Sequence, residues 1–226
     1  RGTRLTFGAT AAETPIWSPD GARVAYISPR VNGYALLAKA ASGAGEEEVL
    51  LEVGASAWPD DWSRDGRLIV IERYSDATGS DLWLLPMTGE RQAVPYLQTP
   101  GNEAHASFSP DGRYLAYSSD ETGVPQIYVQ TVPLSGSKWQ LSTAGGDQAS
   151  WSADGKELYY VSATRELTAL PIRSLDPFGV GEAQVIFPLA IPTLSITGNR
   201  IFYAAAAAGQ RFLVNSLVGA ESDPGI

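Results

Sequence analysis

Six ionisable side chains stand at similar places in a repeated pattern, each a few residues before a turn motif. They are Glu13, Asp60, Asp61, Glu103, His105 and Asp147. If these places converge in the fold, the carboxylates crowd together, which raises their pKa values or favours binding of a cation. The alternative is that each one caps a turn or contacts water, because perturbed charges are often structural. The sequence therefore predicts a candidate ligand-binding cluster, and the alternative is that these residues have only structural roles.

His105 is the only histidine in the chain. Zinc or manganese ligation by several histidines is therefore not available, although carboxylate oxygens alone can hold Ca²⁺ or Mg²⁺. In this alternative the metal ligands are Glu13, Asp60, Glu103 and Asp147. His105, beside Glu103, is then the candidate general base of a metal-assisted ester or phosphoester hydrolase. The expectation that we favour is a structural histidine, no cofactor and no catalysis.

The turn motif consists of an aromatic residue, Ser, any residue, Asp and Gly. It occurs at 17–21, 62–66, 108–112 and 151–155, so that its aspartates are 45, 46 and 43 residues apart. Asp-Gly tolerates the positive φ that a tight hairpin demands. A residue that every repeat needs in order to turn is weak evidence for catalysis. We therefore assign the motif Asp and Ser residues to the turns and its aromatic residues to packing between repeats.

Each repeat is predicted to form four short strands, because its segments between turns are rich in strand-forming residues. Four-stranded units of this period, without an amphipathic helix, predict an all-β protein: a β-propeller of about five four-stranded blades. We predict a single domain over 1–226. Its repeats are approximately 11–53, 54–98, 99–143, 144–188 and a degenerate 189–218.

Closure of the ring is the open question at this stage. The fifth repeat has lost the Asp-Gly turn, and its fourth strand is missing after Ser216. We expect residues 1–10, around Arg4-Leu5-Thr6, to supply a closing strand, since a closed ring leaves no exposed edges. The alternative is that the five repeats are part of a larger ring or assemble into one. An open blade edge would then allow oligomerisation or a purely architectural role.

Composition narrows the function classes. The formal net charge is −9, with 16 Lys and Arg against 25 Asp and Glu, which argues against a nucleic-acid partner. The chain has no cysteine, so disulfides, thiolate metal sites and a Cys nucleophile are excluded. No apolar stretch approaches the length of a membrane span. We expect an extracytoplasmic, periplasmic location in a bacterium, and the cytoplasm remains the open alternative.

The aromatic-Ser-Pro-Asp-Gly turns resemble the repeats of TolB-type propellers, also called WD40-like or PD40 repeats. The stretches 103–130, 138–147 and 151–160 are similar to the propeller that follows the kinase domain of many bacterial serine/threonine kinases. The kinase signatures themselves do not occur here. Arg64 and Ala153 depart from the pattern, because they replace the turn proline. The resemblance implies a propeller that binds proteins or peptides, and some relatives are accessory domains of peptidases.

We therefore predict a non-catalytic recognition or sensor module that binds a protein, peptide or small ligand at the mouth of a central channel. The expected ligand-binding residues are Glu13, Trp58, Asp60, Asp61, Glu103, His105 and Asp147. Trp58 is included because it lies in a proline-containing loop that enters a first strand, where an exposed aromatic ring could contact a partner.

Overall fold

The computed structural model describes residues 4–6, 11–54, 56–191, 201–206 and 211–216, and its regular structure there is all β. Blade 1 contains β1 (Glu13–Trp17), β2 (Arg23–Arg30), β3 (Gly33–Ala40) and β4 (Glu48–Val53). Blade 2 contains β5 (Ala57–Trp62), β6 (Leu68–Ser75), β7 (Gly79–Pro86) and β8 (Val94–Leu97). Blade 3 contains β9 (Glu103–Phe108), β10 (Tyr114–Ser119), β11 (Gln126–Thr131) and β12 (Lys138–Gln140). In each blade the strands pair antiparallel in chain order.

The outer part of blade 4 is more elaborate. The blade contains β13 (Gly146–Trp151), β14 (Glu157–Ser162), β15 (Glu166–Leu175), β16 (Phe178–Val180) and β17 (Gln184–Pro188). The first half of the long β15 pairs with β17 and its second half pairs with β16. A two-stranded sheet of β18 (Tyr203–Ala205) and β19 (Phe212–Val214) follows, which we call the fifth unit.

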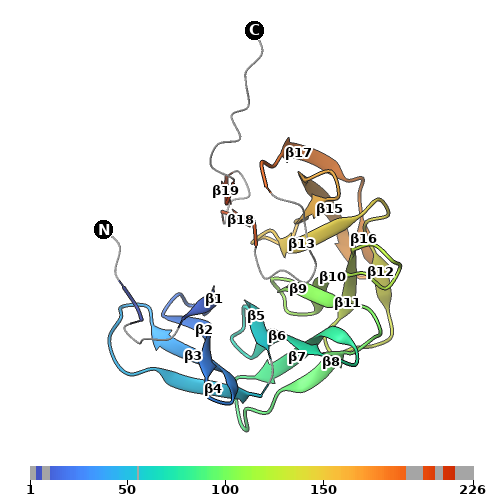
Figure 1. Cartoon of the computed structure of the whole chain (residues 1–226). Coiled ribbons are helices and arrows are strands. Elements are labelled where there is room, and N and C mark those ends of the chain that lie inside the picture. Colours follow the sequence, from blue (N-terminus) through green and yellow to red (C-terminus); the bar gives the residue numbers. More distant parts are fainter. Residues whose placement is uncertain (1–3, 7–10, 55, 192–200, 207–210, 217–226) are drawn as a thin grey trace.

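The blades follow one another along an arc with their first strands toward its middle (Figure 1). β1 contacts β5, β5 contacts β9, and β9 contacts β13. The predicted all-β propeller with about five units is thereby confirmed. Each of the first four predicted repeats holds one blade, and the last repeat is the least regular in its described part.

The predicted closing strand is not present in the part of the N-terminal segment that the structure describes. Residues 4–6 form no strand, and Leu5 packs against the apolar residues of blade 1. Those contacted residues are Val24, Tyr26, Ala35 and Leu37. The rest of the predicted strand, residues 1–3 and 7–10, lies outside the described residues. Association through an open edge remains a prediction.

Aromatic residues at the ends of the first strands hold neighbouring blades together. Trp62, Phe108 and Trp151 are 9%, 5% and 7% exposed, and each packs with residues of the preceding blade. Burying a side chain of this size stabilises a fold by roughly 1.5–3 kcal/mol. The same prediction is wrong for Trp17, which is 61% exposed. Trp17 belongs to blade 1, which has no preceding blade among the described residues.

The turn motif works through its Ser and Asp side chains. In blade 3 the Ser109 hydroxyl donates to Asp111 Oδ1 at 2.6 Å and accepts the backbone N–H of Tyr114 at 3.0 Å. Asp111 Oδ1 also accepts the backbone N–H of Arg113 at 3.1 Å. Gly112 adopts φ 71°, a conformation that costs glycine little. Equivalent Ser-to-Asp bonds occur in the other three blades, so the assignment of the motif to turn formation agrees with these contacts.

Replacement of Asp111 by Ala should therefore lower the free energy of unfolding by about 1–2 kcal/mol, because it removes the acceptor of three local hydrogen bonds, from the Ser109 hydroxyl and from the backbone and side-chain N–H groups of Arg113. Chemical denaturation measures this change. Asp76→Ala is the matched control, since Asp76 lies exposed in the β6–β7 turn and its loss should change stability by less than about 0.5 kcal/mol. Equal stability of the two variants would contradict the assigned role of the motif.

Candidate functional site

The first strand of every blade is irregular at the place three residues before its motif aromatic. Thr14, His105 and Gln148 occupy that place in blades 1, 3 and 4, with φ of 47°, 53° and 59°. Blade 2 has Pro59 there, whose ring forbids positive φ, and its pairing register shifts between Pro59 and Asp61. Such bulges bend a strand and redirect its side chains. The bulges thus set which side chains of the first strands meet.

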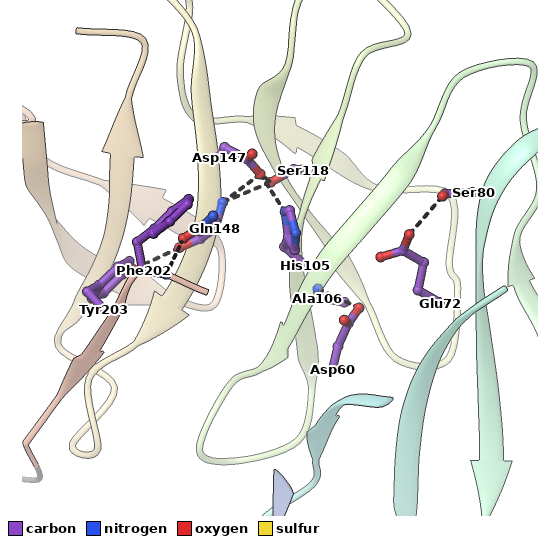
Figure 2. A network of polar contacts seen from close by, with 10 residues as sticks. All are labelled: Asp60, Glu72, Ser80, His105, Ala106, Ser118, Asp147, Gln148, Phe202 and Tyr203. Atoms are coloured by element: carbon purple, nitrogen blue, oxygen red, sulfur yellow. Dashed lines mark hydrogen bonds and ion pairs between the residues drawn. The ribbon is translucent and has the colours of Figure 1, made fainter. Parts of the chain in front are cut away.

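The best-defined polar contact of the site joins blades 3 and 4 (Figure 2). His105 Nδ1 lies 2.7 Å from Asp147 Oδ1, and both side chains are only 2% exposed. The same oxygen accepts the Ser118 hydroxyl at 2.6 Å and the backbone N–H of Gln148 at 2.8 Å. The carboxylate of Asp147 is therefore held in place by three donors from two blades.

Charges from blades 2 and 4 act on this histidine of blade 3. Burial alone would lower the pKa of His105, but the charge and hydrogen bond of Asp147, with the charges of Asp60 and Glu72, raise it to about 9. Burial would raise the pKa of Asp147, yet the charge of His105 and the hydrogen bonds lower it. The two groups therefore form a buried ion pair at neutral pH.

Two further carboxyl groups face the pair from blade 2. Asp60 Oδ2 accepts the backbone N–H of Ala106 at 2.9 Å, and the Ser80 hydroxyl donates to Glu72 Oε1 at 2.7 Å. Burial raises the pKa of both groups, and for Asp60 the charge of Glu72 raises it further. The site therefore contains three acidic groups and one basic group, so that its carboxyl groups outnumber its cation.

The remaining predicted residues lie apart from this pair. Asp61 accepts the backbone N–H groups of Phe108 and Trp62, both at 2.8 Å, and burial raises its pKa to about 6. Its role is to fasten blade 2 to blade 3. Glu13 is exposed at the start of β1. Asp61 thus resembles Asp60, because each accepts a backbone N–H of β9 and has its pKa raised by burial, whereas Glu13 is exposed.

The predicted partnership of Glu103 with His105 is wrong. Glu103 accepts the hydroxyl of Thr99, and burial raises its pKa to about 7, while the carboxylate bound to His105 is that of Asp147. Regular alternation would place residues i and i+2 of a strand on one face. The left-handed backbone at His105 breaks that alternation, so the two side chains are not brought together.

A cavity of ≈ 500 Å³ opens at the middle of the arc. Its lining comes from the first strands of three blades and from the ends of the fifth unit: Thr14, Pro15, Ile16, Trp58, Pro59, Asp60, His105, Ile201 and Asn215. Three predicted residues, Trp58, Asp60 and His105, therefore line one cavity. Asp147 lines a second cavity of ≈ 450 Å³ between blades 3 and 4, with Gly145, Gly146 and Arg165 among its neighbours.

No group of three or more His, Asp or Glu side chains that could hold a metal ion occurs in the described part of the chain. The divalent-cation alternative and the catalytic roles of His105 and Glu103 thus remain predictions. The described residues also contain no helix that is long and apolar enough to cross a membrane.

Sequence reasoning missed Gln148, which links the ion pair to the fifth unit (Figure 2). Its side-chain Oε1 accepts the backbone N–H of Phe202 at 2.9 Å, and its backbone oxygen accepts the Tyr203 hydroxyl at 2.8 Å. Glu72 and Ser118 were missed as well. The available signal for Gln148 was positional, because it stands three residues before Trp151, as His105 stands before Phe108.

Sheets of four antiparallel strands, joined through their first strands around a shared cavity, define a β-propeller-type repeat protein. A family model described as the TolB beta propeller domain, PD40, matches residues 3–222. The chain belongs to this family. The narrower resemblance to kinase-associated propellers is not shown by these comparisons.

Individual relatives agree with the family. The Tol-Pal system protein TolB of Bordetella pertussis is 29% identical over 124 residues, which cover 51% of this chain and 26% of that protein. The crystal structure of TolB from Acinetobacter baumannii has a TM-score of 0.69 at 22% identity, over 83% of this chain and 46% of that chain. An oligogalacturonate lyase in complex with manganese has a TM-score of 0.67 at 14% identity, over 93% and 63%. The matched regions thus cover less than half of these two TolB proteins.

The single imidazole allows a direct test of the ion pair by NMR. We expect the His105 ring to titrate with a pKa of about 9. Because this pKa lies above the unfolded value of about 6.5, the ionisation stabilises the fold fully below pH ~6.5 and is lost as the pH rises through about 9. Asp147→Asn should bring the pKa of His105 below its ordinary value, since burial then dominates. Titration of the wild-type ring at or below its ordinary value would contradict the ion pair.

Hydrogen exchange tests the link to the fifth unit. Gln148→Asn keeps a residue that tolerates positive φ but shortens the side chain that reaches Phe202. We expect exchange in β18 to accelerate by about tenfold, which corresponds to the loss of one hydrogen bond of ~1.4 kcal/mol. Gln140→Asn, on the exposed side of the outer strand β12, is the matched control and should leave β18 unchanged. Unchanged exchange in both variants would show that Gln148 does not hold the fifth unit.

Proposed function

We propose that this chain is a non-catalytic recognition module that binds a segment of a protein at its central cavity. The observation that carries the proposal is the composition of the cavity, whose walls come from blades 1, 2 and 3 and from the fifth unit. A site built from several repeats is shaped by the whole fold, as ligand sites at the centre of repeat proteins are. The expected partner is accordingly a protein or peptide.

The lining has the mixture that peptide recognition needs. Trp58, Ile16 and Ile201 offer apolar surface, and Ile201 is 53% exposed. Asp60, His105 and Thr14 supply polar atoms, and the Thr14 hydroxyl oxygen is buried without a hydrogen-bond partner among the residues that the structure describes. The cavity volume, ≈ 500 Å³, lies within the common range for ligand pockets, which is about 300–1,000 Å³. It can accommodate a few side chains of an extended segment.

The proposal fits the chemistry of His105 better than a hydrolase does. A general base must be neutral at the working pH, and a histidine whose pKa is about 9 is protonated at neutral pH. Membership of the TolB propeller family also supports a binding role. We propose an extracytoplasmic location in a bacterium, which the similarity to bacterial TolB proteins supports.

Selection from a displayed peptide library tests the proposal. Enriched peptides should bind the purified chain, and Trp58→Ala should weaken that binding by about tenfold or more, because it removes a large apolar surface from the cavity. Val185→Ala is the control, since Val185 is 57% exposed on the outer strand β17. Peptides whose binding is insensitive to Trp58→Ala, or failure to enrich any peptide, would contradict a recognition role for this cavity.

A further inference from the structure

In the network around His105, acidic side chains outnumber basic ones. Asp60, Glu72 and Asp147 surround His105, and His105 is already paired with Asp147. This leaves Asp60 and Glu72 without a cation of their own in the network that the described residues form (Figure 2). Burial raises the pKa of both acids, and the charge of His105, which Asp147 shares, lowers it only in part.

Of the two acids, Asp60 is the one that a ligand can reach. It lines the cavity, whereas Glu72 is 1% exposed and is absent from the lining. One oxygen of Asp60 is used by the backbone N–H of Ala106. Trp58, two residues earlier on β5, lines the same cavity. A carboxylate beside an aromatic ring in a partly desolvated cavity is a typical receptor for an ammonium or guanidinium group.

We propose that the central cavity takes up a basic side chain, arginine or lysine, of the bound segment, with Asp60 as its counter-ion and Trp58 as its aromatic contact. The inference rests on the proposed function and names the chemistry of the segment that is recognised. The Thr14 hydroxyl, which has no hydrogen-bond partner among the described residues, belongs to the lining of the same cavity and is a further acceptor. A metal cation fits less well, because no three acidic or histidine side chains among the described residues are arranged so that they could hold a metal ion together.

The proposal carries a pH dependence with a defined sign. Among the described residues, the charges that act on Asp60 are those of Glu72, His105 and Asp61, and Asp147 acts in turn on Glu72. At low pH protons occupy Asp60 and compete with the basic side chain. Binding should therefore become tighter as the pH rises and Asp60 ionises, and it should release protons at intermediate pH. His105 stays charged below about pH 9, because it loses its proton only when the pH rises through its pKa of about 9.

A matched pair of small probes tests the inference on the full chain. N-acetyl-arginine amide and its neutral isostere N-acetyl-citrulline amide are titrated while the unique His105 ring resonance is followed by NMR. We expect the arginine compound to bind at least about tenfold more tightly than the citrulline compound, a difference of ~1.4 kcal/mol. Asp60→Asn should abolish this preference and keep the fold, since Asn retains an oxygen for the Ala106 N–H. Glu46→Gln, at an exposed loop position, should leave the preference unchanged.

The outcomes separate the inference from the proposed function. Three results would each overturn the basic-side-chain proposal. The two probes bind equally, neither probe binds, or the preference for the arginine probe persists in Asp60→Asn. If Asp60→Asn fails to fold, Trp58→Leu takes its place and should weaken the arginine probe selectively. Library peptides that need Trp58 but contain no basic residue would leave the recognition role standing while the inference fails. Library peptides whose binding does not depend on the cavity residues would contradict both the recognition role of the cavity and the basic-side-chain proposal.

Discussion

The burial of one aromatic residue from each of blades 2, 3 and 4 against the preceding blade is the contact on which the rest of the structure depends. Trp62, Phe108 and Trp151 end their first strands in these interfaces. Because each ring must reach the core of its neighbour, the first strands are forced to lie side by side around one centre. Polar residues on those strands are therefore brought close together at that centre. The cluster of acids around His105 is thus a consequence of how the blades pack.

Burying charge at that centre is costly, and the geometry shows how the cost is reduced. Desolvation penalties for a buried ion pair often equal or exceed its attraction, so His105 and Asp147 are weak evidence for stability. Removing one partner alone would leave an uncompensated charge, at a cost of about 3–5 kcal/mol. Asp147 limits that cost with donors from Ser118 and Gln148. Asp60 has fewer such donors. A buried carboxyl group with few hydrogen-bond donors at the wall of a cavity is more typical of a ligand-binding residue than of a structural one.

The repeat period was sufficient to predict the blades, their order and the turn role of Asp111, because these depend on local sequence. It also predicted that Asp60 and His105 converge. The partner of His105 was mispredicted because the assignment assumed regular alternation along β9, and a positive φ at a non-glycine residue has no clear sequence signal. Burial of Trp17 was mispredicted for a different reason: it requires a preceding blade, and no motif encodes that.

The position three residues before the motif aromatic differs from the turn residues, because its side chain changes from blade to blade. The turn residues repeat from blade to blade, as folding requires, whereas this bulge position holds Thr14, Pro59, His105 and Gln148. A position that shares one backbone irregularity but four different side chains is free to serve recognition. Three of the four, Thr14, Pro59 and His105, line the central cavity. The fourth, Gln148, connects the ion pair to the fifth unit. The bulge position therefore both shapes the cavity and holds in place the fifth unit, which forms part of the cavity wall.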